Sequence, residues 1–227
     1  MSKRLVALSL IVGAMVCGSC ALPGQSTGVM GARAPGLPLD EGGYIRHWLV
    51  LGPIYLGENT DSQQIDLEQI PGEGKLMPVD GAVQTAYTTE SDGQTSKQVE
   101  AKLTWYRVDT KEYYFDLNAA LDMENSDNCV GYAVAYLDAA REMGDITFSL
   151  CSNDSGKIFL NGKEIYRFSG SRSTEEDVDA VAGLALHKGI NVIVFKVLNM
   201  TNNWTGNIRV VGRDGIPPPG VTVKVPK

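Results

Sequence analysis

Residues 152–168 read SNDSGKIFLNGKEIYRF, and this stretch indicates the fold class most directly. Two short apolar runs lie on either side of Asn161-Gly162, a pair that suits the positive φ angles of a two-residue type I′ turn. The stretch therefore predicts a β-hairpin. Its polar head, Asn153-Asp154-Ser155, is either the edge of a site or a bend before a strand. We interpret Asp154 as a bend residue, because a short acidic side chain before Ser-Gly accepts backbone N–H groups.

Strand patterns continue on both sides of this hairpin, while helical periodicity is short and ambiguous, at 61–70 and 174–183. Runs rich in β-branched and aromatic residues occur at 44–54, 102–109, 112–117, 130–139, 145–152, 190–200 and 206–215, with 221–225 as a candidate edge strand. Many short strands separated by turns, without crossover helices, predict an all-β fold, an antiparallel β-sandwich.

The composition excludes several classes of function. Acidic residues outnumber basic ones, 27 to 20, for a formal net charge of −7. Phosphate binding needs clustered Lys and Arg, so we expect no nucleic-acid partner. The sequence has two histidines and neither H-E-x-x-H nor G-x-S-x-G, and it therefore predicts no enzyme, no metal and no cofactor. A glycoside-active enzyme with an unrecognised carboxylate pair stays open as an alternative.

The first residues have the features of an export signal, which we place at 1–20. Lys3 and Arg4 precede a largely apolar run at 5–16 and small residues at 17–21. Gly18-Ser19-Cys20 resembles the end of a bacterial lipobox, which predicts lipidation of Cys20; ordinary cleavage before Leu22 is the alternative. Residues 21–43 are rich in Gly and Pro and suit a flexible tether. We therefore expect an exported cell-envelope protein, anchored in the membrane by its lipid or else periplasmic or secreted.

Two cysteines, Cys129 and Cys151, remain after this signal. An exported compartment permits a disulfide. If the runs at 130–139 and 145–152 pair through the intervening turn, Cys151 lies opposite a residue near Ala133 and several positions from Cys129. A disulfide requires Cα atoms roughly 4.4 to 6.8 Å apart. We therefore expect two buried free thiols, with a disulfide as the alternative.

Several segments together resemble a known family, the galactose-binding-like jelly roll related to the sugar-binding domain of family 2 glycoside hydrolases and found in exported bacterial proteins. The segments that carry the resemblance are HWLVLGPI, YAVAYL, SLCSNDSGKIFLNGKEIYR, LHKGINVIVFKVLN and NNWTGNIRVVGRDG. They place one domain at 44–215, with 55–101 as a polar insertion and 216–227 as a Pro-rich tail. The resemblance implies a non-catalytic sandwich that accompanies carbohydrate-active enzymes.

The candidate ligand-binding residues lie in NMTNNWTGN. The indole of Trp204 offers a flat face for a pyranose ring, and the amides of Asn202 and Asn203 can bond to its hydroxyls. The alternative is that Trp204 packs at the end of the sandwich. Trp48 and Trp105 lie inside strand patterns and are expected in the core.

The polar loop before residue 180 carries Arg172 and several acids, and we interpret it as solvated. The acids lack the spacing of a calcium-binding loop; they are Glu175, Glu176, Asp177 and Asp179.

The sequence as a whole predicts an exported binding module with a glycan as its leading ligand. A structural or protein-interaction envelope lipoprotein without a sugar ligand is the alternative.

Overall fold

The computed structural model describes residues 36–92, 94–124 and 126–226. The predicted export signal, the lipidation site at Cys20 and most of the 21–43 tether lie outside the described residues. Of the helices in the described part of the chain, none has the length and apolar character needed to cross a membrane.

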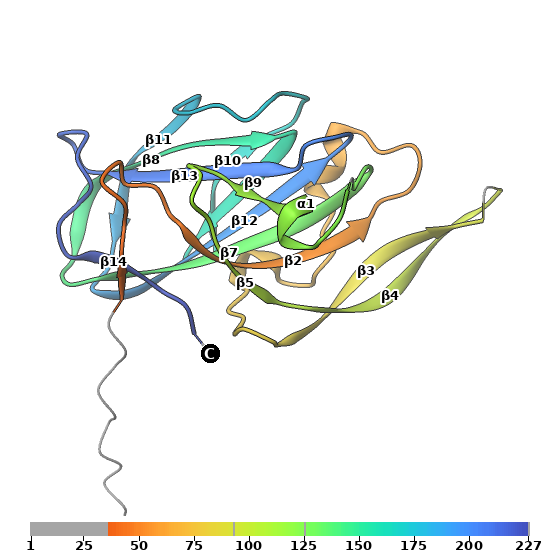
Figure 1. The fold of residues 1–227 in the computed structure, drawn as a ribbon, viewed down its shortest axis with the longest axis horizontal. Coiled ribbons are helices and arrows are strands. Elements are labelled where there is room, and N and C mark those ends of the chain that lie inside the picture. Colours follow the sequence, from red (N-terminus) through yellow and green to blue (C-terminus); the bar gives the residue numbers. More distant parts are fainter. Residues whose placement is uncertain (1–35, 93, 125, 227) are drawn as a thin grey trace, which may run out of the picture. The chain divides into compact units, whose positions relative to one another are not determined.

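The described chain is an antiparallel β-sandwich, which confirms the predicted fold class (Figure 1). The larger sheet runs in the order β1-β14-β7-β12-β9-β10, and β2 pairs with β7 and with β5. Its strands are β1 (Leu37–Pro38), β2 (His47–Tyr55), β5 (Tyr106–Asp109), β7 (Cys129–Ala139), β9 (Ser155–Leu160), β10 (Lys163–Phe168), β12 (Gly189–Asn199) and β14 (Val221–Lys224).

The smaller sheet runs in the order β11-β8-β13-β6. Its strands are β6 (Phe115–Asp116), β8 (Met143–Asn153), β11 (Asp179–Leu186) and β13 (Thr205–Val211). A separate hairpin joins β3 (Val83–Ser91) to β4 (Ser96–Thr104) and extends past the two main sheets in Figure 1. The helical pieces are short: η1 (Ser62–Asp66), η2 (Glu73–Lys75) and α1 (Leu117–Ala120).

The main core lies between the two sheets. Phe148 of β8 and Ile208 of β13 face Phe195 of β12 across it, and Phe115 meets Phe195 edge to face with ring centroids 5.6 Å apart. Trp48 and Trp105 are buried, as the sequence predicts.

The larger sheet is buried on its outer face as well. Residues 56–82, which include η1 and η2, cover that face, and Ile65, Ile70 and Leu76 pack there against Tyr132 and Val194. A sheet covered on both faces needs apolar residues at successive positions, and this explains the continuous apolar run of β7. The region that looked like a polar insertion is therefore part of the hydrophobic structure.

The hairpin predicted around Asn161-Gly162 is confirmed. β9 and β10 pair on either side of it, and both residues have positive φ, 52° and 83°. By contrast, the runs at 130–139 and 145–152, for which we considered a direct pairing, do not pair with each other. β7 pairs with β12 in the larger sheet and β8 pairs with β13 in the smaller sheet, so the turn between them crosses from one sheet to the other.

Cys129 and Cys151 are both buried and free, which confirms the prediction of two thiols. The folded body also takes in residues at both ends of the expected 44–215 range. Val221 and Val223 are buried in β14, which lies between β1 and β7. The finer assignment to a galactose-binding-like jelly roll stays a prediction.

Candidate functional site

A row of polar side chains crosses one end of the smaller sheet. Thr205 of β13 lies opposite Asn153 of β8 on one side and opposite Asp116 of β6 on the other. Residues opposite each other in antiparallel strands project to the same face. Phe115, one position along β6, points into the core, so this row projects to the outer face.

The row forms the floor of a hollow of about 290 Å³, which we call the tyrosine pocket. Its walls come from connections that are distant in the sequence. Tyr113 and Tyr114 precede β6, and Asn203 precedes β13. The connection between β10 and β11 supplies Ser173 and Thr174, and the Thr174 hydroxyl lies 2.6 Å from that of Thr205.

The two tyrosines give the pocket its apolar surface. Both are half-buried, and their rings are nearly perpendicular, with centroids 5.1 Å apart and an interplanar angle of 84°. The ring of Tyr44 lies behind Tyr113, 5.9 Å away. These ring contacts favour the observed orientations of Tyr113 and Tyr114.

Asn153 is the most unusual residue of the pocket. It is only 8% exposed, yet no hydrogen bond among the described residues uses its side-chain amide. Asn118, Asn199 and Asn207 differ in that each donates from Nδ2 to a backbone carbonyl, although the Oδ1 of each has no partner in the described part of the chain. The Oδ1 atoms of those three asparagines are enclosed, whereas the amide atoms of Asn153 reach the open space of the pocket. Asn153 therefore presents a free donor and a free acceptor at the floor of the pocket.

Asp116 adds a carboxylate to the pocket. One of its oxygens, Oδ1, accepts the backbone N–H of Ala119 at 3.1 Å and caps the short helix α1. Within the described chain, its other oxygen takes part in no hydrogen bond. That oxygen is available to a ligand.

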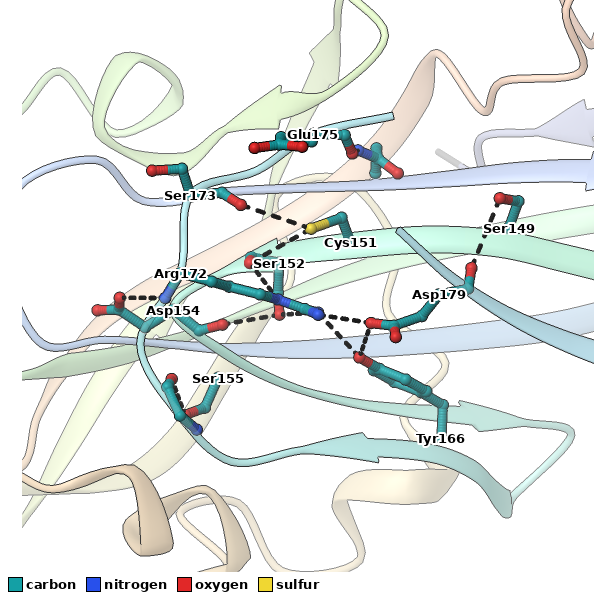
Figure 2. Close-up of polar contacts among 12 residues, drawn as sticks. Ser149, Cys151, Ser152, Asp154, Ser155, Tyr166, Arg172, Ser173, Glu175 and Asp179 are labelled. Carbon is teal, nitrogen blue, oxygen red and sulfur yellow. Dashed lines mark hydrogen bonds and ion pairs between the residues drawn. The ribbon is translucent and has the colours of Figure 1, made fainter. Parts of the chain in front are cut away.

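Arg172 fixes the loop that forms one wall (Figure 2). Its guanidinium donates to the Ser152 carbonyl at 3.0 Å, to Asp179 at 2.5 Å and to the Tyr166 hydroxyl at 2.8 Å. It also stacks over the ring of Phe168, 3.8 Å from the centroid. Burial raises the pKa of Tyr166, and its hydrogen bond to Asp179 raises it further. The Arg172 side chain is therefore structural rather than solvated, which corrects the sequence-based interpretation.

Asp154 joins two of the connections that form the pocket. Its Oδ1 accepts the Ser171 hydroxyl at 2.7 Å and the Arg172 backbone N–H at 3.3 Å, and its Oδ2 accepts the backbone N–H of Met200 at 2.9 Å. The sequence indicated an acceptor of backbone N–H groups. These groups belong to neighbouring loops rather than to the bend itself.

The rest of this loop, residues 171–177, lies across the outer face of the smaller sheet. Asn207 donates to the Glu175 carbonyl at 3.0 Å, and Asp177 accepts from Ser149 at 2.5 Å and from Arg209 at 2.8 Å. The acidic side chains Asp177 and Asp179 therefore contact different partners and do not converge on one point. No group of three or more potential metal ligands occurs among residues 36–226 that the structure describes.

The structure brings one of the three sequence-predicted residues, Asn203, to the pocket. Trp204 is fully buried; its Nε1 donates to the Val197 carbonyl at 3.0 Å, and its ring packs against Gly131. It has no face open to solvent, so the predicted indole platform is absent from this surface. Asn202 is exposed but lies outside the pocket lining. The aromatic segment at 112–117 was the sequence signal for the tyrosines that do line the pocket.

Comparisons with known proteins identify no family. No protein-family model matches the chain, and no curated protein matches it. Among solved structures, it is similar to the PA14 domain of the MpAFP antifreeze protein, with 13% identity and a TM-score of 0.36 over 86% of this chain and 98% of that chain. A similarity this low indicates neither a family nor a ligand for this chain.

Proposed function

We propose that this protein is an exported, non-catalytic carbohydrate-binding module, held at the bacterial cell envelope by a lipid on Cys20, and that the tyrosine pocket is its site. The observation that carries the proposal is the Asn153 amide, which has no hydrogen-bond partner among the described residues and faces the pocket beside two tyrosine rings.

The chemistry of the pocket suits a sugar. A pyranose has faces of C–H groups and a rim of hydroxyls, each of which donates and accepts hydrogen bonds. Ligand sites combine apolar surface with a few convergent polar groups. Here Tyr113 and Tyr114 supply the apolar surface, and Asn153 and Asn203 supply amides that both donate and accept. In this proposal Asn203 remains a ligand-binding residue, as the sequence predicted, and Tyr113 and Tyr114 replace Trp204 as the aromatic surface.

The pocket favours binding over hydrolysis. Glycosidases generally need two carboxyl groups roughly 5 to 10 Å apart. Asp116 is the one carboxylate among the described residues that line the pocket. This supports a module without catalytic activity, which assays on chromogenic glycosides can test.

The test is calorimetric titration of the purified chain with a panel of neutral mono- and oligosaccharides. For a sugar that binds, we expect Asn153→Ala and Tyr114→Ala each to weaken affinity about tenfold, because each removes a group that contacts the ligand. Tyr106→Ala is the matched control, since Tyr106 is 50% exposed and lies outside the pocket. Absence of binding across the panel would overturn the proposal and favour a protein-interaction role.

The anchor is tested independently. Mass spectrometry of the membrane fraction should find diacylglycerol on Cys20, and Cys20→Ser should release the protein from membranes. Recovery of an unmodified chain in the soluble fraction would replace the anchor with simple secretion.

A further inference from the structure

The charge carried by the described lining of the tyrosine pocket is of one sign. Asp116 is the one charged side chain among the described lining residues. Glu175 and Glu176 follow Thr174 in the 171–177 loop, and both acids add to the rise that burial gives the pKa of Tyr113. The cation nearest in sequence to this wall, Arg172, is engaged with Asp179 and Ser152. The charge on the described lining of the pocket is therefore negative.

Two features of the pocket suit a cation directly. The free oxygen of Asp116 can accept a charge-assisted hydrogen bond, because Oδ1 alone is used by the Ala119 N–H. The faces of Tyr113 and Tyr114 carry negative partial charge and attract ammonium groups. An anionic ligand would meet repulsion from Asp116 and find no basic partner among the described lining residues.

We infer that the pocket selects a sugar that carries a protonated amino group, that is, a hexosamine unit without an N-acetyl group. This inference rests on the proposed function and specifies its ligand. The ammonium lies against Asp116, the sugar ring lies against the tyrosines, and the hydroxyls bond to Asn153 and Asn203. Uronic acids are excluded by charge.

The experiment compares four probes at pH 6 and low salt: glucosamine, N-acetylglucosamine, glucose and glucuronate, each titrated into the purified chain. Glucosamine should bind about fivefold more tightly than either neutral sugar, and glucuronate should show no binding. Added salt should reduce the preference for glucosamine, because ions screen the partly exposed charge.

Two variants assign the preference to one residue. Asp116→Asn removes the charge and keeps the cap of α1, since Asn and Asp cap helices equally well; it should make glucosamine and glucose bind alike. Asp122→Asn is the matched control. Asp122 is exposed, lies outside the pocket and has a φ of 55°, which Asn tolerates. It should leave the preference unchanged.

The outcomes separate the two proposals. Equal affinity of the wild-type chain for glucosamine and glucose would overturn the inference and leave the carbohydrate site intact. The same holds if a preference survives in folded Asp116→Asn, as judged by its thermal unfolding curve. If none of the four probes and no sugar of the neutral panel binds, the proposed function itself fails.

Discussion

The outer faces of the two sheets are both covered by irregular chain, and Lys196 under one cover differs from Asn153 under the other. On the larger sheet, Lys196 is fully buried, and its Nζ lies 2.8 Å from Glu73, which the Tyr132 hydroxyl also contacts. On the smaller sheet, the Asn153 amide has no partner among the described residues and opens to the floor of the pocket. A paired buried group indicates a structural role, whereas an unpaired one at a pocket indicates a place for a ligand.

The two covers also differ in how they are attached. The 56–82 segment adds Ile65 and Ile70 to a hydrophobic cluster, so apolar burial holds it together with the ion pair. The 171–177 loop is attached mainly through polar contacts, with Arg172 and Asp177 at their centre. The first cover is part of the core, and the second leaves room for a site.

Breaking the buried pair should have the largest effect. Lys196→Met leaves Glu73 buried without its cation, and we expect the free energy of unfolding to fall by about 3–5 kcal/mol. Sugar affinity should not change, because the pair lies on the other sheet. Chemical denaturation measures the loss, with exposed Lys188→Met as the control. A loss below about 1 kcal/mol would contradict a structural role for this pair.

Trp204→Phe distinguishes core packing from ligand binding. It removes part of a buried ring system and the hydrogen bond from Nε1 to the Val197 carbonyl, so we expect a loss of about 2–3 kcal/mol in unfolding free energy. Sugar affinity should stay within about twofold of the wild type. Unchanged stability together with lost binding would return Trp204 to the ligand site.

Arg172→Met loosens the cover of the smaller sheet. It removes charge-assisted hydrogen bonds to Asp179 and the Ser152 carbonyl, and we expect a loss of about 2 kcal/mol. Sugar affinity should also fall, because Ser173 and Thr174 of the pocket follow directly. Arg213→Met, at an exposed position, is the control for both measurements. If stability falls and affinity does not, this loop is not part of the site.

The smallest effect is expected from Asp66, at the rim of the larger sheet's cover. The hydrogen bond from Arg167 lowers the pKa of Asp66 to about 2 from 3.8. Since the folded-state pKa is depressed, its stabilising contribution is present above pH 3.8 and is lost as the pH falls through 2. Asp66 is 45% exposed, so the effect amounts to a few tenths of a kcal/mol.

Denaturation of the wild type and Asp66→Asn at several pH values tests this effect. The stability difference between them should be constant near neutral pH and shrink below pH 4. A difference that grows toward low pH would have the wrong sign.

The features that could be predicted from the sequence are those that depend on neighbouring residues in the chain. The β-branched runs, the Asn161-Gly162 hairpin and the buried Trp48 and Trp105 follow from alternation, turn chemistry and size. The sequence could not predict which sheet each strand joins, because a run buried on both faces, such as β7, carries no alternation that indicates its partner.

The site was harder to predict than the fold, for a related reason. Tyr113 and Asn203 are far apart in the chain and meet only because β6, β8 and β13 are neighbours in the smaller sheet. Trp204 and Asn203 are adjacent in sequence, yet one is buried and the other exposed. Sequence alone could not assign their side chains to opposite sides of the chain.

The pairing of β1 with β14 has a consequence for engineering. Leu37 lies opposite Val223, so the two ends of the described fold leave from the same edge of the larger sheet. A short Gly-Ser linker could therefore join them, with new termini opened in the turn between β3 and β4. Such a circular permutant should retain the sandwich, and it would present the tyrosine pocket on a scaffold attached through that hairpin.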